Sequence, residues 1–242
     1  MIGIWALLGL MSVGLSVGAF GGHPDDPEDD TAQDPVAEPA NGTENADLLA
    51  ATDLGALAHV QDGDPVVLDG GDGDDVIRGG TGDDTLRGNT GVDDLFGGLG
   101  HNLLVGGAGN DSLSGYADDL DDGSFEAQDK DTRDYLFGSD GDDELILGND
   151  DYATGGAGAD VFVTGSFVAP GQEGRVQDFD VTEDRIEIYY DPAVDGADPV
   201  ISAADTGRGQ FELLFDGVPI LNVVGEIPTD PDQILLVATT YA

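Results

Sequence analysis

Aspartate recurs at intervals of nine residues along the middle of this chain, with glycines at fixed offsets before it. The repeated pattern is G-G-x-G-x-D-x-U-x, in which U is a large apolar residue. Carboxylate oxygens and unobstructed backbone carbonyls are the ligands that hard divalent cations such as calcium prefer. The residues at the sixth position of the pattern are Asp75, Asp84, Asp93, Asn102, Asp111, Asp143 and Asp160.

The glycines of the pattern permit backbone angles that a side chain would forbid, so each loop closes tightly and leaves its carbonyl oxygens accessible. Asn102 keeps a carbonyl oxygen but lacks the charge of its equivalents, so we expect its site to be weaker. The candidate backbone ligands are Gly70, Gly71, Gly73, Gly79, Gly80, Gly82, Gly88, Gly91, Gly97, Gly100, Gly106, Gly109, Gly138, Gly141, Gly155 and Gly158.

These loops must be positioned by strands that the same repeat encodes. The copies follow one another without an inserted or lost residue over 70–114, and the pattern returns at Gly138 and Gly155. The pattern predicts a six-residue turn and a three-residue strand in each repeat, with the apolar eighth positions stacked in a core. The residues at the eighth position are Ile77, Leu86, Leu95, Leu104, Leu113, Leu145 and Phe162.

The apolar stack is too small to order the repeats without help. Burying one such side chain contributes roughly 1.5–3 kcal/mol. Ordering six polar, glycine-rich residues costs about 1–2 kcal/mol each in backbone entropy. We therefore predict that the folding of this region is coupled to calcium binding.

The nonapeptides resemble those of the RTX (repeats-in-toxin), or hemolysin-type, calcium-binding family. The resemblance implies an all-β fold: a right-handed parallel β-roll, two nonapeptides to a turn, with a C-terminal β-rich capping module. It also implies that several calcium ions (Ca2+) are bound, each between a loop and the loop two repeats along. The pairs that would share an ion include Asp75 with the loop at Gly88, Asp84 with the loop at Gly97, and Asp93 with the loop at Gly106.

Weaker copies extend the array on both sides, so we place the β-roll at 42–163. The copy at 129–137 keeps Asp134 as a further candidate ligand, although its glycines are lost. The acidic segment 115–128 is an insertion that must loop out of the stack. One residue is missing near 147–154, where we expect the stack to be distorted.

After residue 163 the repeats give way to other β-strand patterns, and we predict a C-terminal β module over 164–242. Alternating apolar residues predict strands within 175–190, and Asp216-Gly217 is typical of a hairpin turn. The strings VQDFD and DRIEI resemble the segment that closes the roll in serralysin-like RTX proteins. In those relatives the C-terminal region also carries a type I secretion signal.

Residues 1–20 contain no charged side chain, and as a helix they would reach about 30 Å, the thickness of a bilayer core. We predict a targeting or anchor segment, and both a cleaved signal peptide and a retained anchor remain open. Residues 21–41 are acidic and proline-rich, which is typical of a disordered linker. We expect a short helix over 48–60.

The formal net charge of −44, from 51 acidic and 7 basic residues, restricts the partners. So few basic residues cannot neutralise the phosphates of a nucleic acid. The chain has no cysteine, so it contains no disulfide. The expected partners are calcium, an export machinery and, through residues 1–20, a membrane.

Sequence motifs of enzymes are lacking. The three histidines form no H-E-x-x-H zinc site, and the G-x-S-x-G at Gly14–Gly18 lies within the N-terminal apolar run, away from any strand–turn–helix context. We therefore predict no catalytic residue and no enzymatic activity. The sequence favours a secreted or surface-tethered calcium-binding RTX protein, extracellular and structural or adhesive. The alternative is a secreted hydrolase with an unrecognised site in 164–242, and a membrane-damaging toxin is a third hypothesis.

Overall fold

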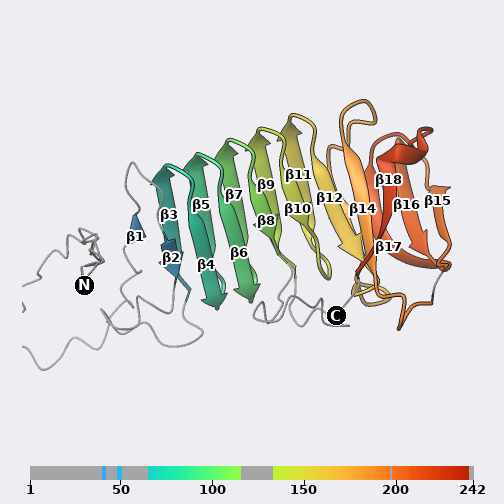
Figure 1. Ribbon diagram of the computed structural model, residues 1–242, viewed down its shortest axis with the longest axis horizontal. Coiled ribbons are helices and arrows are strands. Elements are labelled where there is room, and N and C mark those ends of the chain that lie inside the picture. Colours follow the sequence, from blue (N-terminus) through green and yellow to red (C-terminus); the bar gives the residue numbers. More distant parts are fainter. Residues whose placement is uncertain (1–39, 42–47, 51–64, 116–132, 197, 240–242) are drawn as a thin grey trace, which may run out of the picture. The chain divides into compact units, whose positions relative to one another are not determined.

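The computed structural model describes residues 40–41, 48–50, 65–115, 133–196 and 198–239. This part of the chain consists of β-strands, joined by turns and loops, and one short 3-10 helix, η1 (Pro231–Gln233) (Figure 1). It contains no helix that is long and apolar enough to cross a membrane. The predicted targeting segment and most of the predicted linker lie outside the described residues.

The strands in chain order are β1 (Ala40–Asn41), β2 (Leu48–Ala50), β3 (Val67–Asp72), β4 (Val76–Thr81), β5 (Thr85–Thr90), β6 (Asp94–Leu99), β7 (Leu103–Ala108), β8 (Ser112–Ser114), β9 (Tyr135–Asp140), β10 (Glu144–Ile146), β11 (Tyr152–Ala157), β12 (Val161–Gly165), β13 (Gly174–Val176), β14 (Arg185–Tyr190), β15 (Ile201–Asp205), β16 (Gln210–Phe215), β17 (Val218–Val224) and β18 (Ile234–Ala238).

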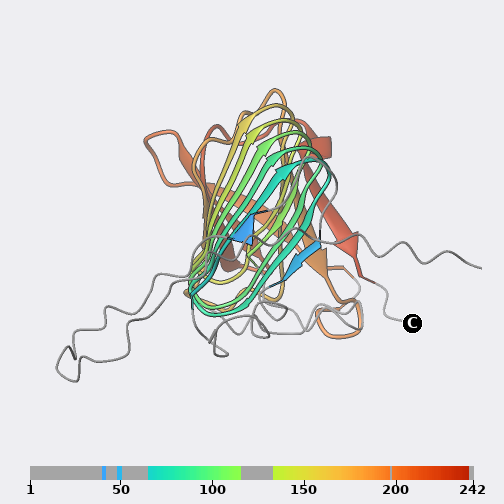
Figure 2. The same ribbon diagram turned by 90° about the vertical axis from the view of Figure 1, so that its left-hand side faces the viewer.

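From β1 to β14, consecutive strands alternate between two sheets, so that each pair of strands makes one turn of a flattened roll (Figure 2). Sheet A has the order β1-β3-β5-β7-β9-β11-β13-β17-β16-β15, and sheet B has the order β18-β14-β12-β10-β8-β6-β4-β2. Strands from successive turns pair in parallel, as β3 does with β5 and β4 with β6. The fold is therefore the all-β parallel β-roll that the repeats predict.

Most repeats form longer strands and shorter turns than the sequence pattern predicts. The strands β4 and β5 are six residues long, and only residues 82–84 separate them. Each strand takes in the first three positions of the next repeat, where Gly71 pairs with Asn89 and Asp72 with Thr90. The expected six-residue turn is therefore wrong for these repeats. Since these positions gain backbone hydrogen bonds, the entropy of ordering them is offset more fully than we expected from the sequence.

The apolar eighth positions form the core of the roll. In sheet A, Leu86 pairs with Leu104, which pairs with Leu136 across the next strand. In sheet B, Ile77 pairs with Leu95 in the same manner. All five side chains are fully buried, so the nine-residue recurrence of apolar residues becomes two facing stacks between the sheets.

The register across the insertion shows how the roll absorbs extra residues. The backbone N–H of Asp93 bonds to a residue 18 positions later, whereas that of Asp111 bonds to a residue 32 positions later. The strands on the two sides of the insertion therefore keep the register of the roll, as β9 pairs in parallel with β7. Further along, the spacing falls to 17 residues at Asp143, because one residue is missing from the repeat that spans β10 and β11.

Parallel stacking continues past residue 163, because β12 pairs with β14 and β14 with β18. Sheet A ends differently, since β15, β16 and β17 are antiparallel, and β16 turns into β17 at Asp216-Gly217 as the sequence predicts. Side chains of these strands, including Phe211 and Leu221, belong to the same apolar cluster as the repeats. The helix expected over 48–60 is wrong at its start, because 48–50 forms strand β2, and 51–60 lies outside the described residues.

Candidate metal centre

The sixth-position side chains lie in two rows, one at each edge of the roll where the chain passes between the sheets. The turns that lead from sheet A to sheet B hold what we call the Asp75 row, and those that lead back hold the Asp84 row. The Asp75 row is Asp75, Asp93, Asp111, Asp143, Asp160 and Asp184. The Asp84 row is Asp84, Asn102, Asp134 and Asp151.

A ladder of hydrogen bonds runs along each row. The backbone N–H of Asp75 donates to Asp93 Oδ1 at 2.8 Å, and the N–H of Asp93 donates to Asp111 Oδ1 at 2.9 Å. In the other row the N–H of Val66 donates to Asp84 Oδ1 at 2.9 Å. Each side chain therefore uses one oxygen to join its turn to the turn before it.

The second oxygen of several of these carboxylates has no such partner. Among the described residues, Oδ2 of Asp84, Asp93, Asp111 and Asp143 is buried and accepts no hydrogen bond. The four side chains are at most 2% exposed. A buried carboxylate without compensation is strongly unfavourable, so these atoms identify positions at which a cation would stabilise the fold.

Backbone carbonyls converge on the same positions. A Cβ added to Gly79 would lie 2.5 Å from Asp84 Oδ2 and 2.5 Å from the carbonyl oxygen of Gly97, two repeats along. The equivalent position at Gly88 lies against Asp93 Oδ2 and 2.7 Å from the carbonyl oxygen of Gly106. The structure thus brings together the carboxylate and loop pairs that the sequence places in shared sites. The glycine at the first position keeps this oxygen-lined space open.

The glycines at the second and fourth positions of the pattern have different roles. Those at the second position, such as Gly71 and Gly80, have φ of 103° and 97°, which favours glycine. Those at the fourth position, such as Gly91, combine a positive φ with close contact to the turn before. The predicted glycines therefore all lie at the turns or at the strand ends that enter them. Their role as metal ligands stays a prediction.

The donor set explains why no side-chain cluster marks the sites. The described residues contain no group of three or more His, Cys, Asp and Glu side chains with metal-binding geometry. Each loop contributes one carboxylate, and the remaining oxygens belong to the backbone. Calcium accepts such mixed sets of carboxylate and carbonyl oxygens. The residues present therefore fit the ion that the repeat pattern implies.

Burial raises the pKa of aspartates in both rows. It raises the pKa of Asp84, Asp111 and Asp143 to about 6, because desolvation of the charged form outweighs the backbone N–H bond that each accepts. Burial likewise raises the pKa of Asp160 and Asp184 to about 6. In the absence of a cation, these groups favour the folded state only when they are protonated.

We expect the calcium-free chain to gain β-structure as the pH falls from about 7.5 to about 5. The folded-state pKa of about 6 exceeds the ordinary value of 3.8, so the folded chain binds more protons between these values. The resulting stability is greatest below the ordinary value and is lost as the pH rises through the folded value. Far-UV circular dichroism in chelator measures this change, and a pH-independent spectrum over that range would contradict it.

Two members of the rows escaped the sequence analysis. Asp151 accepts the N–H of Asp134 at 2.7 Å, and Asp184 accepts the N–H of Asp160 at 2.9 Å. Each stands two residues before a buried apolar residue, as every sixth position does. This D-x-U signal was available, but Asp151 follows a shortened repeat and Asp184 lies 24 residues after Asp160.

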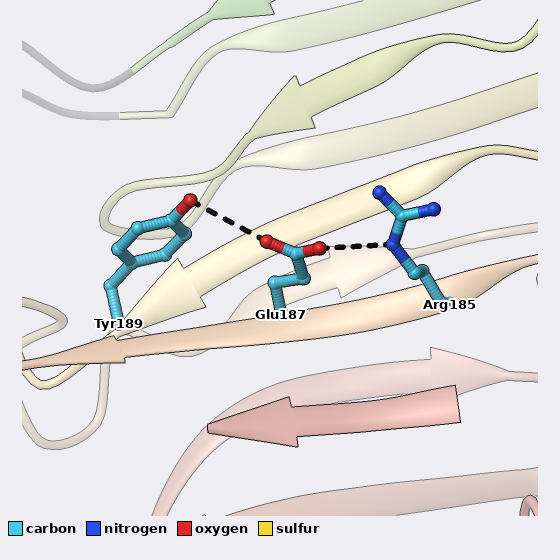
Figure 3. Close-up of polar contacts among 3 residues, drawn as sticks. All are labelled: Arg185, Glu187 and Tyr189. Atoms are coloured by element: carbon cyan, nitrogen blue, oxygen red, sulfur yellow. Dashed lines mark hydrogen bonds and ion pairs between the residues drawn. The ribbon is translucent and has the colours of Figure 1, made fainter. Parts of the chain in front are cut away.

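Strand β14 carries a group of polar contacts on the outside of sheet B (Figure 3). Arg185 Nε donates to Glu187 Oε1 at 2.9 Å, and Tyr189 Oη donates to Glu187 Oε2 at 3.4 Å. Both oxygens of Glu187 are thus engaged by side chains of its own strand. An ion pair as exposed as this one contributes little to stability, and its geometry is that of a surface contact along the strand.

Comparison with known families identifies the repeats. The family model described as RTX calcium-binding nonapeptide repeat matches four times, at residues 69–104, 96–119, 130–151 and 147–167. Residues 69–167 are RTX repeats. The chain therefore contains RTX calcium-binding nonapeptide repeats, and these repeats lie in the β-roll.

Two solved structures are similar to parts of this chain. A subunit of the Azotobacter vinelandii mannuronan C5-epimerase matches 60% of this chain and 83% of its own, with 21% identity and a TM-score of 0.36. The extracellular lipase LipA from Serratia marcescens matches 78% of this chain but 42% of its own, with 19% identity and a TM-score of 0.31. A search of curated protein sequences finds no match.

Proposed function

We propose that this chain is a secreted or surface-tethered RTX protein whose β-roll folds when it meets extracellular calcium, and that its role is structural or adhesive. The observation that carries the proposal is the buried Oδ2 atom that Asp84, Asp93, Asp111 and Asp143 leave without a hydrogen bond. Calcium would neutralise these charges and replace the missing partners. The regular stack of strands supports a structural role, because a solenoid offers extended, repeated faces.

The ligands would come from two loops at a time. Asp84 would supply its Oδ2 together with the carbonyl oxygen of Gly97, and Asp93 its Oδ2 together with that of Gly106. Because each ion would join one turn to the next, loss of calcium would weaken the contacts between turns. Folding of the roll and binding of the metal are then one process.

The charge of the chain supports folding outside the cell. A formal net charge of −44 makes the calcium-free chain repel itself. In the cytosol, where calcium is scarce, this repulsion would keep the chain unfolded and ready for an export machinery. Extracellular calcium modules bind with dissociation constants of roughly 10⁻⁴–10⁻³ M, so the fold would form after export.

A calcium titration of the full chain after chelation tests the proposal. We expect far-UV circular dichroism to show a cooperative transition to β-structure at roughly 10⁻⁴–10⁻³ M calcium. Magnesium is the control, and we expect no transition with it, because magnesium demands a tighter octahedral set of ligands. Full β-structure in the chelator at neutral pH would contradict metal-coupled folding.

A further inference from the structure

The side chain of Asn102 is held in one orientation by the turn before it. The backbone N–H of Asp84 donates to Asn102 Oδ1 at 2.9 Å. Only the carbonyl oxygen of the amide accepts such a bond, so the amide nitrogen must occupy the other position. Asn102 Nδ2 accordingly donates to the carbonyl oxygen of Gly98 at 3.2 Å.

This nitrogen stands where the equivalent repeats place a carboxylate oxygen. A Cβ added to Gly97 would lie 2.8 Å from Asn102 Nδ2, whereas at Gly88 the matching neighbour is Asp93 Oδ2. An N–H donor carries partial positive charge and offers no lone pair to a cation. It also uses the Gly98 carbonyl, an oxygen of the same loop. The amide nitrogen therefore takes the place of the carboxylate oxygen and uses a carbonyl oxygen of the loop.

At the end of each row, the protein itself supplies a hydrogen-bond partner to the second carboxylate oxygen. Asp151 Oδ2 accepts the N–H of Gly148 at 2.7 Å, and Asp184 Oδ2 accepts the N–H of Asp180 at 2.8 Å. Since Oδ1 of both residues also accepts a backbone N–H, both oxygens of each carboxylate have a hydrogen-bond donor. These two residues mark where each row stops requiring calcium.

We infer that the two edges of the roll bind calcium unequally, and that the Asn102 amide excludes calcium from the position that the side chain at 102 would otherwise coordinate. The Asp75 row has aspartate at every sixth position from Asp75 to Asp160, whereas the Asp84 row is interrupted at Asn102. This inference rests on the proposed role of the sixth-position carboxylates as calcium ligands. It goes further than the expectation of a weaker site, because the carbonyl oxygen that Asn102 retains is used by the Asp84 N–H.

The variant Asn102→Asp tests the inference, with Asn110→Asp as its matched control. Asn110 is exposed and lies in a repeat turn of the other row, so its change adds the same charge away from the loop of Asn102. We expect native mass spectrometry at saturating calcium to show one more bound ion in Asn102→Asp than in the unchanged chain. We expect no additional ion in Asn110→Asp.

Each outcome distinguishes this inference from the proposed function. An unchanged chain that binds no calcium would overturn the proposed function. If the unchanged chain binds calcium but Asn102→Asp gains no ion, the exclusion by the amide is wrong while calcium binding stands. The variant Asn102→Ala adds a second measurement, because loss of an ion there would show that Asn102 is itself a ligand.

Discussion

Alanine at Gly91 is expected to prevent the calcium-dependent transition or to raise its midpoint at least tenfold. Gly91 begins a three-residue turn between β5 and β6, with φ of +146°. A side chain in this conformation costs roughly 1–3 kcal/mol in backbone strain. Its Cβ would also overlap the carbonyl oxygen of Gly73, in the turn before.

The overlap makes this position more sensitive than strain alone would suggest. The atoms that a Cβ would meet belong to the backbone of the neighbouring turn, so no side-chain rotation relieves the collision. Overpacking in a close-packed region adds typically about 1–3 kcal/mol. Because the turns stack directly, the displaced turn carries Asp93 and the hydrogen bond that it accepts from Asp75 out of register. Calcium binding and turn stacking would therefore be lost together.

Gly171→Ala is the matched control for this experiment. Gly171 also has a positive φ, of 85°, but a Cβ there would meet nothing within 4 Å. We expect this variant to lose only about 1–2 kcal/mol, the ordinary penalty of a left-handed residue. Calcium titrations of both variants followed by circular dichroism give the comparison. Equal midpoints for the two variants would show that contact between turns is not limiting.

Much of the fold follows from the nine-residue period, because period and phase decide both strand pairing and burial. Leu86 and Leu104 are 18 residues apart in the sequence and paired in the sheet, so the core residues of the roll can be predicted from the repeats. The hairpin at Asp216-Gly217 was also predictable, because its two residues adopt the positive φ angles of 50° and 82° that such turns require.

The division of each repeat into turn and strand could not be obtained in the same way. Glycine is a poor strand former by intrinsic preference, so the first positions of the pattern indicate a loop. In the stacked roll, Gly71 of β3 pairs with Asn89 of β5, because the parallel register aligns the backbone hydrogen-bonding groups of the two strands. Tertiary contact thus overrides local preference at these positions.

The positions of the candidate site residues were predictable, but the hydrogen bonds of the exceptional residues were not. The resemblance to RTX proteins implies that Asp93 and the loop at Gly106 belong together, and in the structure a Cβ at Gly88 would lie against both Asp93 Oδ2 and the Gly106 carbonyl oxygen. The orientation of the Asn102 amide depends on a hydrogen bond from Asp84, and the closing of the Asp184 carboxylate depends on the N–H of Asp180. Such partners are assigned by the geometry of the turns, which the spacing alone does not contain.

Replacing Asp84 and Asp93 together by asparagine is expected to raise the calcium midpoint by about tenfold or more, as loss of groups at metal sites commonly does. Asparagine is nearly isosteric, and its Oδ1 would still accept the backbone N–H of Val66 or Asp75. Each new Nδ2 would then face the glycine carbonyls, as it does at Asn102. The hydrogen-bond ladder along each of the two rows is retained, while one proposed cation site in each row is removed.

The same change should have the opposite effect without calcium. Burial raises the pKa of both Asp84 and Asp93, which means that their charged forms oppose folding at neutral pH. Replacing them by neutral amides removes this penalty, so the calcium-free variant should be at least as folded as the unchanged chain. Circular dichroism and denaturant titrations, each with and without calcium, would measure the two opposite shifts.

The control is the double variant Asp94→Asn and Asp140→Asn, which removes the same charge from exposed positions. We expect a small change in its calcium midpoint, because screened surface charges interact weakly. If both double variants shift the midpoint equally, general charge repulsion rather than ligand loss governs the transition. If the Asp84 and Asp93 variant keeps its midpoint, the buried Oδ2 atoms are not the calcium ligands. A double variant that is less stable than the unchanged chain with calcium, but at least as stable without it, is the result expected only if Asp84 and Asp93 are buried calcium ligands.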